Sequence, residues 1–276
     1  MRRSINSTLF ITLLISVLMA SCSNSAVQPD DKAKSKNPLS AFAEYDLGMN
    51  GTFAKSHRTD DQTYFKWKSA LDAQLPEGYR IPTFKEMCVI LPARQLFWPR
   101  PTDLKTTGEE VTIEGKEGSY AAEYYGKGDK VIYAIRFIDE KGDNQHRTAF
   151  KYEFKDEGSL NARMVVTTRY IGNVPGITME KVMAANFFEE GAKENIVTRI
   201  FPLAGYSDGL SGHEGHYSNV GSKVVDGTHK GYWWSATLHH EGEDPMAYSM
   251  QVTKLSAQMS WDRSDVIAQM VRPIRK

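Results

Sequence analysis

The first strong pattern in the chain is a short apolar run that follows two basic residues. Arg2 and Arg3 precede residues 9–19, which are mostly Leu, Ile, Val, Phe and Met. The run is much shorter than the roughly 20 apolar residues that a membrane-spanning helix needs. A basic start, a short apolar run and small residues at its end are typical of a secretory signal peptide. We therefore predict that residues 1–21 are a signal peptide.

Three later segments carry apolar residues at helical spacing, and each predicts a helix. They are residues 59–74, residues 83–91 and residues 178–190. Thr83 and Glu86 have the spacing of a capping box, which predicts that the second helix begins at Thr83. Cys88 then shares a face of this helix with Phe84 and Leu91, so we expect a buried and unreactive thiol.

Between and after these helices the pattern changes to β-branched and aromatic runs separated by turn residues. Runs of this kind predict antiparallel strands joined as a meander. The runs of the first group are residues 120–125, 131–137, 150–154 and 164–170, and those of the last group are 232–237, 247–252, 258–261 and 270–274.

Composition narrows the choice of partners and the way in which the chain is stabilised. Lys plus Arg equals Asp plus Glu, at 34 each. A neutral chain has no overall field that attracts nucleic acid, so we expect no nucleic-acid partner. The chain has 2 cysteines, Cys22 and Cys88. If Cys22 is lipidated, Cys88 has no intramolecular partner, and the folded body must be stabilised by its core.

The residues before Cys22 resemble a bacterial lipobox. They read Leu18-Met19-Ala20-Ser21-Cys22, with two small residues before the cysteine. The resemblance implies that Cys22 becomes the first residue of the mature protein and carries the lipid, with a palmitate-type acyl group among its chains. Several acyl chains anchor a protein firmly, whereas one does not. The expected location is the outer membrane. Both leaflets are alternatives, one facing the cell surface and the other the periplasm. Residues 22–40 are polar and predict a flexible tether.

Three motifs resemble the Fibrobacter-type major paralogous domain, which is common in lipoproteins of Bacteroidetes. They are residues 78–83 (Gly-Tyr-Arg-Ile-Pro-Thr) with Glu86, residues 201–206 (Phe-Pro-Leu-Ala-Gly-Tyr), and residues 231–237 (Gly-Tyr-Trp-Trp-Ser-Ala-Thr) with a terminal Val-Arg-Pro-Ile-Arg at 271–275. The resemblance implies an α+β, C-type-lectin-like domain over residues 41–276, related in fold to formylglycine-generating enzymes. Two or three helices, short antiparallel strands and a β-meander insertion at about 101–175 would build it.

The motif residues themselves are expected to be structural. Arg80, Arg272 and Arg275 flank prolines, where an arginine usually donates to carbonyls or a carboxylate. Strand alternation places Trp233 and Trp234 on opposite faces, which predicts that one fills the core and the other lies nearer the surface.

The candidate ligand contacts lie in two polar segments near the C-terminal end. Residues 208–231 form a glycine-rich segment that is too long for a simple connection between two strands. Long loops of this kind often carry function. Residues 239–244 add two histidines and three acids. The predicted ligand-binding residues are Asp208, His213, His216, Tyr217, His229, His239 and His240. Tyr206, Tyr217 or an exposed Trp could stack on a sugar face.

A metal site is a second interpretation of the same histidines and acids. His213 and His216 are three residues apart, which is not the zinc-protease spacing of four on a helix. Folded together, the two histidine segments and His229 could still supply metal ligands. The calcium candidates are Glu241, Glu243, Asp244 and Asp262. Trp261-Asp262 partly resembles the Trp-Asn-Asp calcium motif of lectins, without its Asn. No cofactor is expected, with calcium as the exception to test.

Two classes of function remain. The sequence has no nucleophile elbow, phosphate loop or dinucleotide motif, and it has no cysteine in its C-terminal half for the oxidation chemistry of the lectin-fold enzymes. We therefore predict a non-enzymatic binding or adhesion module for a glycan, a matrix protein or a fimbrial subunit. The alternative is an envelope enzyme that acts on polysaccharide or on exported proteins, because paired carboxylates need proximity only in space.

Overall fold

A computed structural model describes residues 36–207, 216–218 and 224–276 of the chain, with backbone alone for 216–218. The chain divides into two units, Met1–Lys34 and Ser35–Lys276. All that follows concerns the second unit. The predicted signal peptide, Cys22 and most of the predicted tether lie outside the described residues. Asn37 and Leu39 are already fully buried, so the folded body begins before residue 41.

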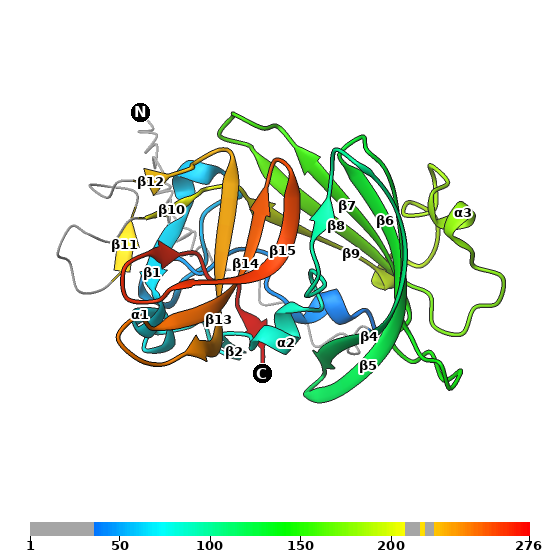
Figure 1. Ribbon diagram of the computed structural model, residues 1–276, viewed down its shortest axis with the longest axis horizontal. Helices are drawn as coiled ribbons and strands as arrows, with labels where there is room; N and C mark the ends of the chain where they lie inside the picture. Colours follow the sequence, from blue (N-terminus) through cyan, green and yellow to red (C-terminus); the bar gives the residue numbers. More distant parts are fainter. Residues whose placement is uncertain (1–35, 208–215, 219–223) are drawn as a thin grey trace, which may run out of the picture. The chain divides into compact units, whose positions relative to one another are not determined.

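The largest element is a six-stranded antiparallel sheet whose strands follow one another in sequence (Figure 1). Its strands are β4 (Pro101–Ile113), β5 (Lys116–Lys127), β6 (Val131–Ile138), β7 (Thr148–Lys155), β8 (Arg163–Tyr170) and β9 (Ile196–Pro202). This arrangement confirms the predicted meander. The sheet extends beyond the predicted insertion at about 101–175, because β9 is added at its edge, next to β8. Residues 171–195 connect these two strands.

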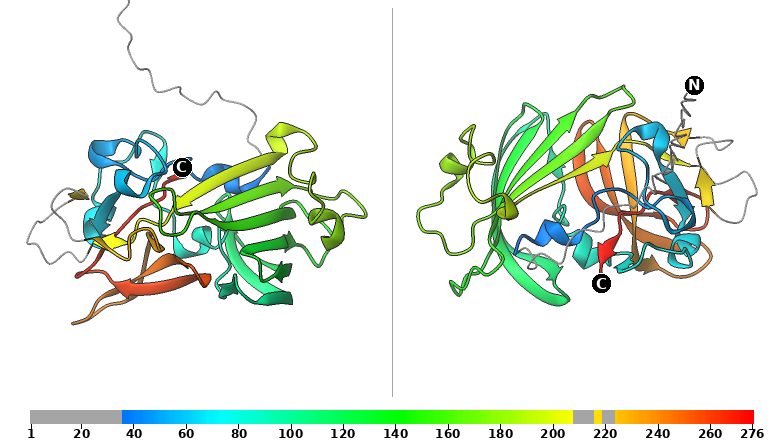
Figure 2. Two further views of the ribbon diagram at one scale, coloured as in Figure 1. Left: turned by 90° about the horizontal axis from the view of Figure 1, so that it is seen from above. Right: turned by 180° about the vertical axis from the view of Figure 1, so that it is seen from behind.

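A second antiparallel sheet of four strands contains the Trp-Trp motif. Its order is β13 (Lys230–His240), β14 (Met246–Thr253), β15 (Ser256–Arg263) and β3 (Leu96–Phe97). The register of β13 on β14 shifts between Trp234 and Leu238 and again before His240. In Figure 2 the green strands of the six-stranded sheet and the orange strands of the four-stranded sheet form separate layers.

Two small sheets complete the strands. One has the order β11 (His216–Ser218), β1 (Thr63–Lys66), β16 (Ala268–Gln269), β10 (Tyr206–Ser207) and β12 (Val224–Val225), and the other pairs β17 (Ile274–Arg275) with β2 (Tyr79–Arg80).

The helices are shorter than the sequence predicts. They are α1 (Trp67–Leu71), α2 (Phe84–Met87) and α3 (Met179–Val182), with 3-10 turns η1 (Pro38–Ala41), η2 (Met49–Gly51), η3 (Thr59–Asp61) and η4 (Lys193–Asn195). None of the described helices is long and apolar enough to cross a membrane. The long helix expected at 59–74 is wrong. Tyr64 and Phe65 are neighbours in a strand and both are buried. Their side chains point to opposite faces of the strand, and both faces are covered, whereas a helix at the surface would bury only one face.

The α+β, C-type-lectin-like expectation is also wrong. The chain is mostly β, with 46% strand and 12% helix, and its antiparallel sheets form a β-sandwich-like fold. The physical reason is that the predicted helices at 59–74 and 178–190 do not continue. The third ends after one turn, and Phe187 then packs under the guanidinium of Arg169, whose Nη1 donates to the carbonyl of Phe187 at 2.6 Å.

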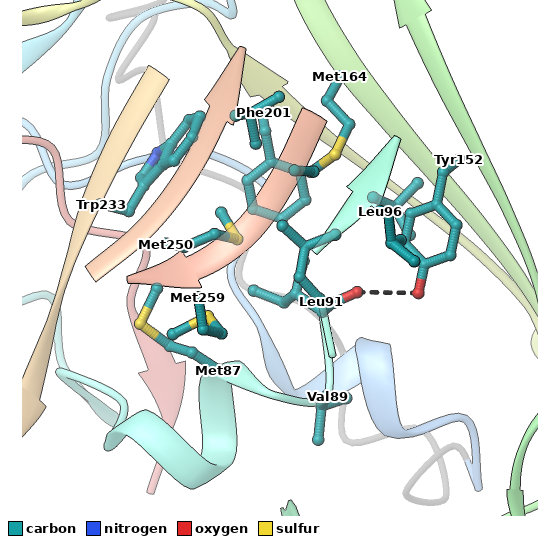
Figure 3. Close-up of a cluster of buried hydrophobic side chains, with 14 of the residues drawn as sticks. Met87, Val89, Leu91, Leu96, Tyr152, Met164, Phe201, Trp233, Met250 and Met259 are labelled. Carbon is teal, nitrogen blue, oxygen red and sulfur yellow. Dashed lines mark hydrogen bonds between the residues drawn. The ribbon is translucent and has the colours of Figure 1, made fainter. Parts of the chain in front are cut away.

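One buried cluster joins the two large sheets (Figure 3). Trp233, Met250 and Met259 come from the four-stranded sheet, Tyr152 and Met164 from the six-stranded sheet, and Met87 and Leu91 from α2 and the turn after it. A second cluster covers the opposite face of the four-stranded sheet and contains Trp234, Phe65 and Val271. Trp233 and Trp234 are both fully buried, so the expectation that one lies near the surface is wrong. Both faces of β13 are covered at this point.

Candidate functional site

The motif that begins with Gly78 builds a helix start and an ion pair. Thr83 Oγ1 accepts from the Glu86 backbone N–H at 3.3 Å, and the Glu86 carboxylate accepts from the Thr83 N–H at 2.9 Å. This confirms the predicted capping box. Arg80 Nη1 donates to Glu86 Oε2 at 2.7 Å, and Nη2 donates to the second oxygen. Burial raises the pKa of Glu86, but Arg80 and the Thr83 N–H outweigh that effect and leave the pKa lowered.

The terminal Val-Arg-Pro motif holds a second, fully buried ion pair. Arg272 Nε donates to Asp46 Oδ1 at 2.6 Å, and both side chains have no exposed surface. The other guanidinium nitrogens donate to the backbone carbonyls of Ala43, Glu44 and Ile200. The Trp233 indole N–H also donates to Asp46, at 3.1 Å. These contacts confirm the structural role predicted for Arg80 and Arg272, and the fully buried Arg272 is not accessible to a ligand.

Cys88 lies beside another buried pair. Arg136 has no exposed surface and contacts Glu109 at 3.0 Å, and its Nη atoms donate to the carbonyls of Cys88 and Val89. Burial raises the pKa of the Cys88 thiol to about 12. A thiol with such a pKa is not a nucleophile at neutral pH, which confirms the inert cysteine. The shallow pocket at this point, of about 200 Å³, has this fully bonded guanidinium in its wall.

The structure separates the residues predicted to bind a ligand. Asp208 and His213 lie outside the described residues, and His216 and Tyr217 are described only as a strand that pairs with β1. His229 precedes β13, and its Nδ1 lies 3.7 Å from a Glu157 oxygen. His239 and His240 are at the other end of the same strand. At about 3.3 Å per residue, His229 and His239 are roughly 30 Å apart. The interpretation that His229 and the 239–244 segment share one metal is therefore wrong.

At the far end of the four-stranded sheet, three aromatic rings lie together. We call His239, Tyr248 and Trp261 the aromatic ledge. The rings of His239 and Trp261 are stacked, with centroids 4.6 Å apart and planes 22° apart. Tyr248 meets His239 edge-on at 4.8 Å. Because His239 and Trp261 stand on the strands that flank Tyr248, their rings reach over the central strand. Trp261 is nevertheless 50% exposed.

The ledge lies on the core-facing side of its sheet. Tyr248 is paired directly with Trp261, and two residues further along the same strands Met250 is paired with Met259. Residues two apart on a strand point to the same face. The ledge therefore continues the face that packs against the six-stranded sheet, beyond the part that is covered. Phe84 of α2 supports its base, with its ring 4.2 Å from that of Tyr248.

Several carboxylates lie at the end of the sheet that carries the ledge. Glu241, Glu243 and Asp244 are exposed in the loop between β13 and β14. Arg263, at the end of β15, contacts Asp244 at 2.6 Å and Asp265 at 3.0 Å. The end of the sheet is thus acidic, and its strand-end arginine is shared by two of the acids.

The calcium candidates do not converge. Asp262 follows Trp261 in β15 and so points to the opposite face of the sheet, where Gln269 approaches it at 3.4 Å. Burial raises the pKa of Asp262, which disfavours the charged form that a cation needs. Within the described residues, no three His, Cys, Asp or Glu side chains are grouped to hold a metal ion. Calcium binding stays a prediction without a site among Glu241, Glu243, Asp244 and Asp262.

Of the three ledge residues, the sequence predicts only His239 as a ligand contact, and it places Trp261 in a partial calcium motif. The signal that could have found the ledge is strand alternation. Ala257, Met259 and Trp261 share one face of β15, and the first two are core residues. Trp261 lies on the same face but beyond the part that the six-stranded sheet covers.

Comparison with known proteins gives a family but no function. Residues 34–274 match the family described as a domain of unknown function (DUF8237). No curated protein and no solved structure matches the chain.

Proposed function

Since the chain belongs to the DUF8237 family of domains of unknown function, its role has to be argued from its own residues, and we propose that it is a lipid-anchored binding module of the cell envelope. Its ligand face is the aromatic ledge. The observation that carries the proposal is that Trp261 is 50% exposed while held in place by the stacked ring of His239.

Rigid, half-exposed aromatic rings suit recognition for a physical reason. An exposed indole has a large apolar surface that gains free energy when a ligand covers it. Its rotamer is already fixed by His239 and by the paired strands, so little side-chain entropy is lost on binding.

The anchor is supported by the sequence before the folded body. Residues 1–21 have the pattern of a signal peptide, and Cys22 follows two small residues as in a lipobox. Asn37 is the first fully buried residue that the structure describes. The segment between Cys22 and Asn37 is then the tether that separates the acyl chains from the ledge-bearing body.

Binding is favoured over catalysis by the state of the reactive groups. The pKa of Cys88 is raised to about 12 by burial, and His239 uses its ring for stacking. Arg136 and Arg272 are saturated by protein acceptors. The alternative is an envelope enzyme acting on polysaccharide or exported proteins, and it would use an acid and a base among the His239, Glu241 and Glu243 side chains.

The test is a binding screen with glycans, matrix proteins and fimbrial subunits on the purified full chain and on Trp261→Ala. The expected result is a ligand that the wild-type chain binds and the variant binds at least about tenfold more weakly, as for an interface hot spot. Phe97→Ala is the matched control. Phe97 is 40% exposed in the same sheet but lies about 16 Å along β15 from Trp261. Equal binding by wild type and Trp261→Ala would exclude the ledge as the ligand face.

A further inference from the structure

We propose that the ledge binds a single hexopyranose ring of a glycan that carries no carboxylate, sulfate or phosphate. This inference rests on the proposed function and names the ligand class of the same site. Three features of the ledge lead to it: its small size, the exposed face of its indole and its acidic surroundings.

The ledge is too small for a protein partner. A stable protein interface buries about 800 Å² on each side around an apolar centre. The large exposed hydrophobic side chains are scattered over different elements: Met49, Leu71, Phe97, Leu160, Val174, Leu255 and Trp261. Phe97 and Leu255 lie at the opposite end of the four-stranded sheet, next to the β14–β15 turn. Of these strongly exposed side chains, Trp261 alone belongs to the ledge.

The indole offers a flat surface of matching shape. One side of Trp261 is covered by the imidazole of His239 at 4.6 Å, and half of its surface stays open to solvent. A pyranose ring presents a face of C–H groups that can cover such a surface, with its hydroxyls directed outward from the rim of the ring. Its axial or equatorial hydroxyls would decide which sugar fits best.

The groups around the ledge suit hydroxyl donors. Glu241 and Glu243 are exposed beside the strand that carries His239, and ionised carboxylates can only accept hydrogen bonds. Asp244 and Asp265 share Arg263, so that arginine is already engaged. An anionic sugar would meet an excess of negative charge, because Arg263 is the one cation in these contacts and two acids already pair with it. A neutral sugar meets acceptors for its hydroxyls and no repulsion.

The probes are hexaoses of glucose, galactose, mannose and N-acetylglucosamine, with hexauronates of glucose, galactose and mannose as anionic counterparts. Binding is measured by isothermal titration calorimetry on the full chain. The detergent is of the polyoxyethylene type, because a maltoside would itself present sugar rings. At least one neutral hexaose should bind. Trp261→Ala should weaken that binding about tenfold or more, and Phe97→Ala should leave it unchanged. The corresponding hexauronate should bind at least about tenfold more weakly, and Glu241→Gln with Glu243→Gln should narrow this gap.

The outcomes separate this inference from the proposed function. If no neutral hexaose binds at millimolar concentration, or if the hexauronates bind as well, the ligand class is wrong. The binding module would still stand if Trp261→Ala abolishes capture of a protein in the screen above. If a neutral hexaose binds equally well to Trp261→Ala, both this inference and the assignment of the ledge are wrong. Unchanged circular dichroism and Tm in Trp261→Ala would show that any lost binding is not lost folding.

Discussion

Replacing Arg272 with Met should be among the most damaging single changes in the folded body. The guanidinium has no exposed surface, and it contacts Asp46 at 2.6 Å and the carbonyls of Glu44 and Ile200 at 2.6 Å each. Met fills much of the same space, so the main effect is electrostatic. The change leaves Asp46 buried without a counter-ion, and breaking a buried pair in this way costs about 3–5 kcal/mol. In a domain of this size, that lowers Tm by on the order of 10 °C.

The assay is urea unfolding of wild type and variants, followed by circular dichroism. Asp46→Asn with Arg272→Met should regain part of the loss, because no buried charge is then left alone. Burial raises the pKa of Asp46 while Arg272 lowers it. Without Arg272 the pKa rises further, so the defect should be smaller at pH 4 than at pH 7, where the carboxyl must ionise. Arg275→Met, at an exposed position, should change the free energy of unfolding by less than about 0.5 kcal/mol. A loss below 1 kcal/mol in Arg272→Met, or equal losses in the two variants, would refute the reasoning.

Four further outcomes are expected. Cys22→Ala should abolish palmitate labelling and outer-membrane fractionation, and retention of both in the variant would contradict the anchor. Trp234→Ala should cost about 3–5 kcal/mol in the free energy of unfolding, because the side chain is fully buried; an unchanged Tm would contradict that. Burial lowers the pKa of His57 to about 4, with Arg272 and two further arginines adding to the effect. The unfolded chain binds this proton near pH 6.5, so stability should fall as pH drops from 6.5 to 4. The loss should be roughly 1–2 kcal/mol after allowance for partial exposure, and His57→Phe, which keeps the ring against Tyr45, should reduce it. Cys88 should resist alkylation at pH 8 until the chain is unfolded, and rapid labelling of the native chain would contradict its burial.

Local sequence chemistry predicts part of this fold well. The capping box of Thr83 and Glu86 is seen as expected, because both partners lie within one helical turn. The meander was predicted because its strands pair with their neighbours in sequence. In both cases the interacting groups are close in the chain.

Long-range packing accounts for what the sequence does not predict. Tyr64, Trp67 and Ala70 have helical spacing, and Trp67 and Ala70 do lie in α1. Tyr64 lies instead in β1, which pairs with β11 and β16 from distant parts of the chain. Trp233 and Trp234 are both buried because different clusters cover the two faces of β13. No local pattern shows that both faces are covered. The α+β expectation is wrong for the same reason. The family resemblance from which it came stays a prediction that rests on the three sequence motifs.

Only one residue of the aromatic ledge, His239, could be predicted from the sequence. The imidazole of His239 predicts a ligand contact, but its partners Tyr248 and Trp261 lie on strands that meet it only in the folded sheet. The hypothesis of a shared metal site requires His229 and His239 to fold together, and β13 holds them apart.

The most direct test of the ledge as the ligand face uses the histidine ring signals in the NMR spectrum. His239 and His229 lie near opposite ends of β13 and can be assigned with His239→Asn and His229→Asn. On titration with a ligand found in the screen, the account predicts that the His239 ring signals shift with the same Kd as calorimetry gives, while those of His229 stay in place. A saturating ligand that leaves His239 unmoved, or that shifts His229 instead, would contradict the account.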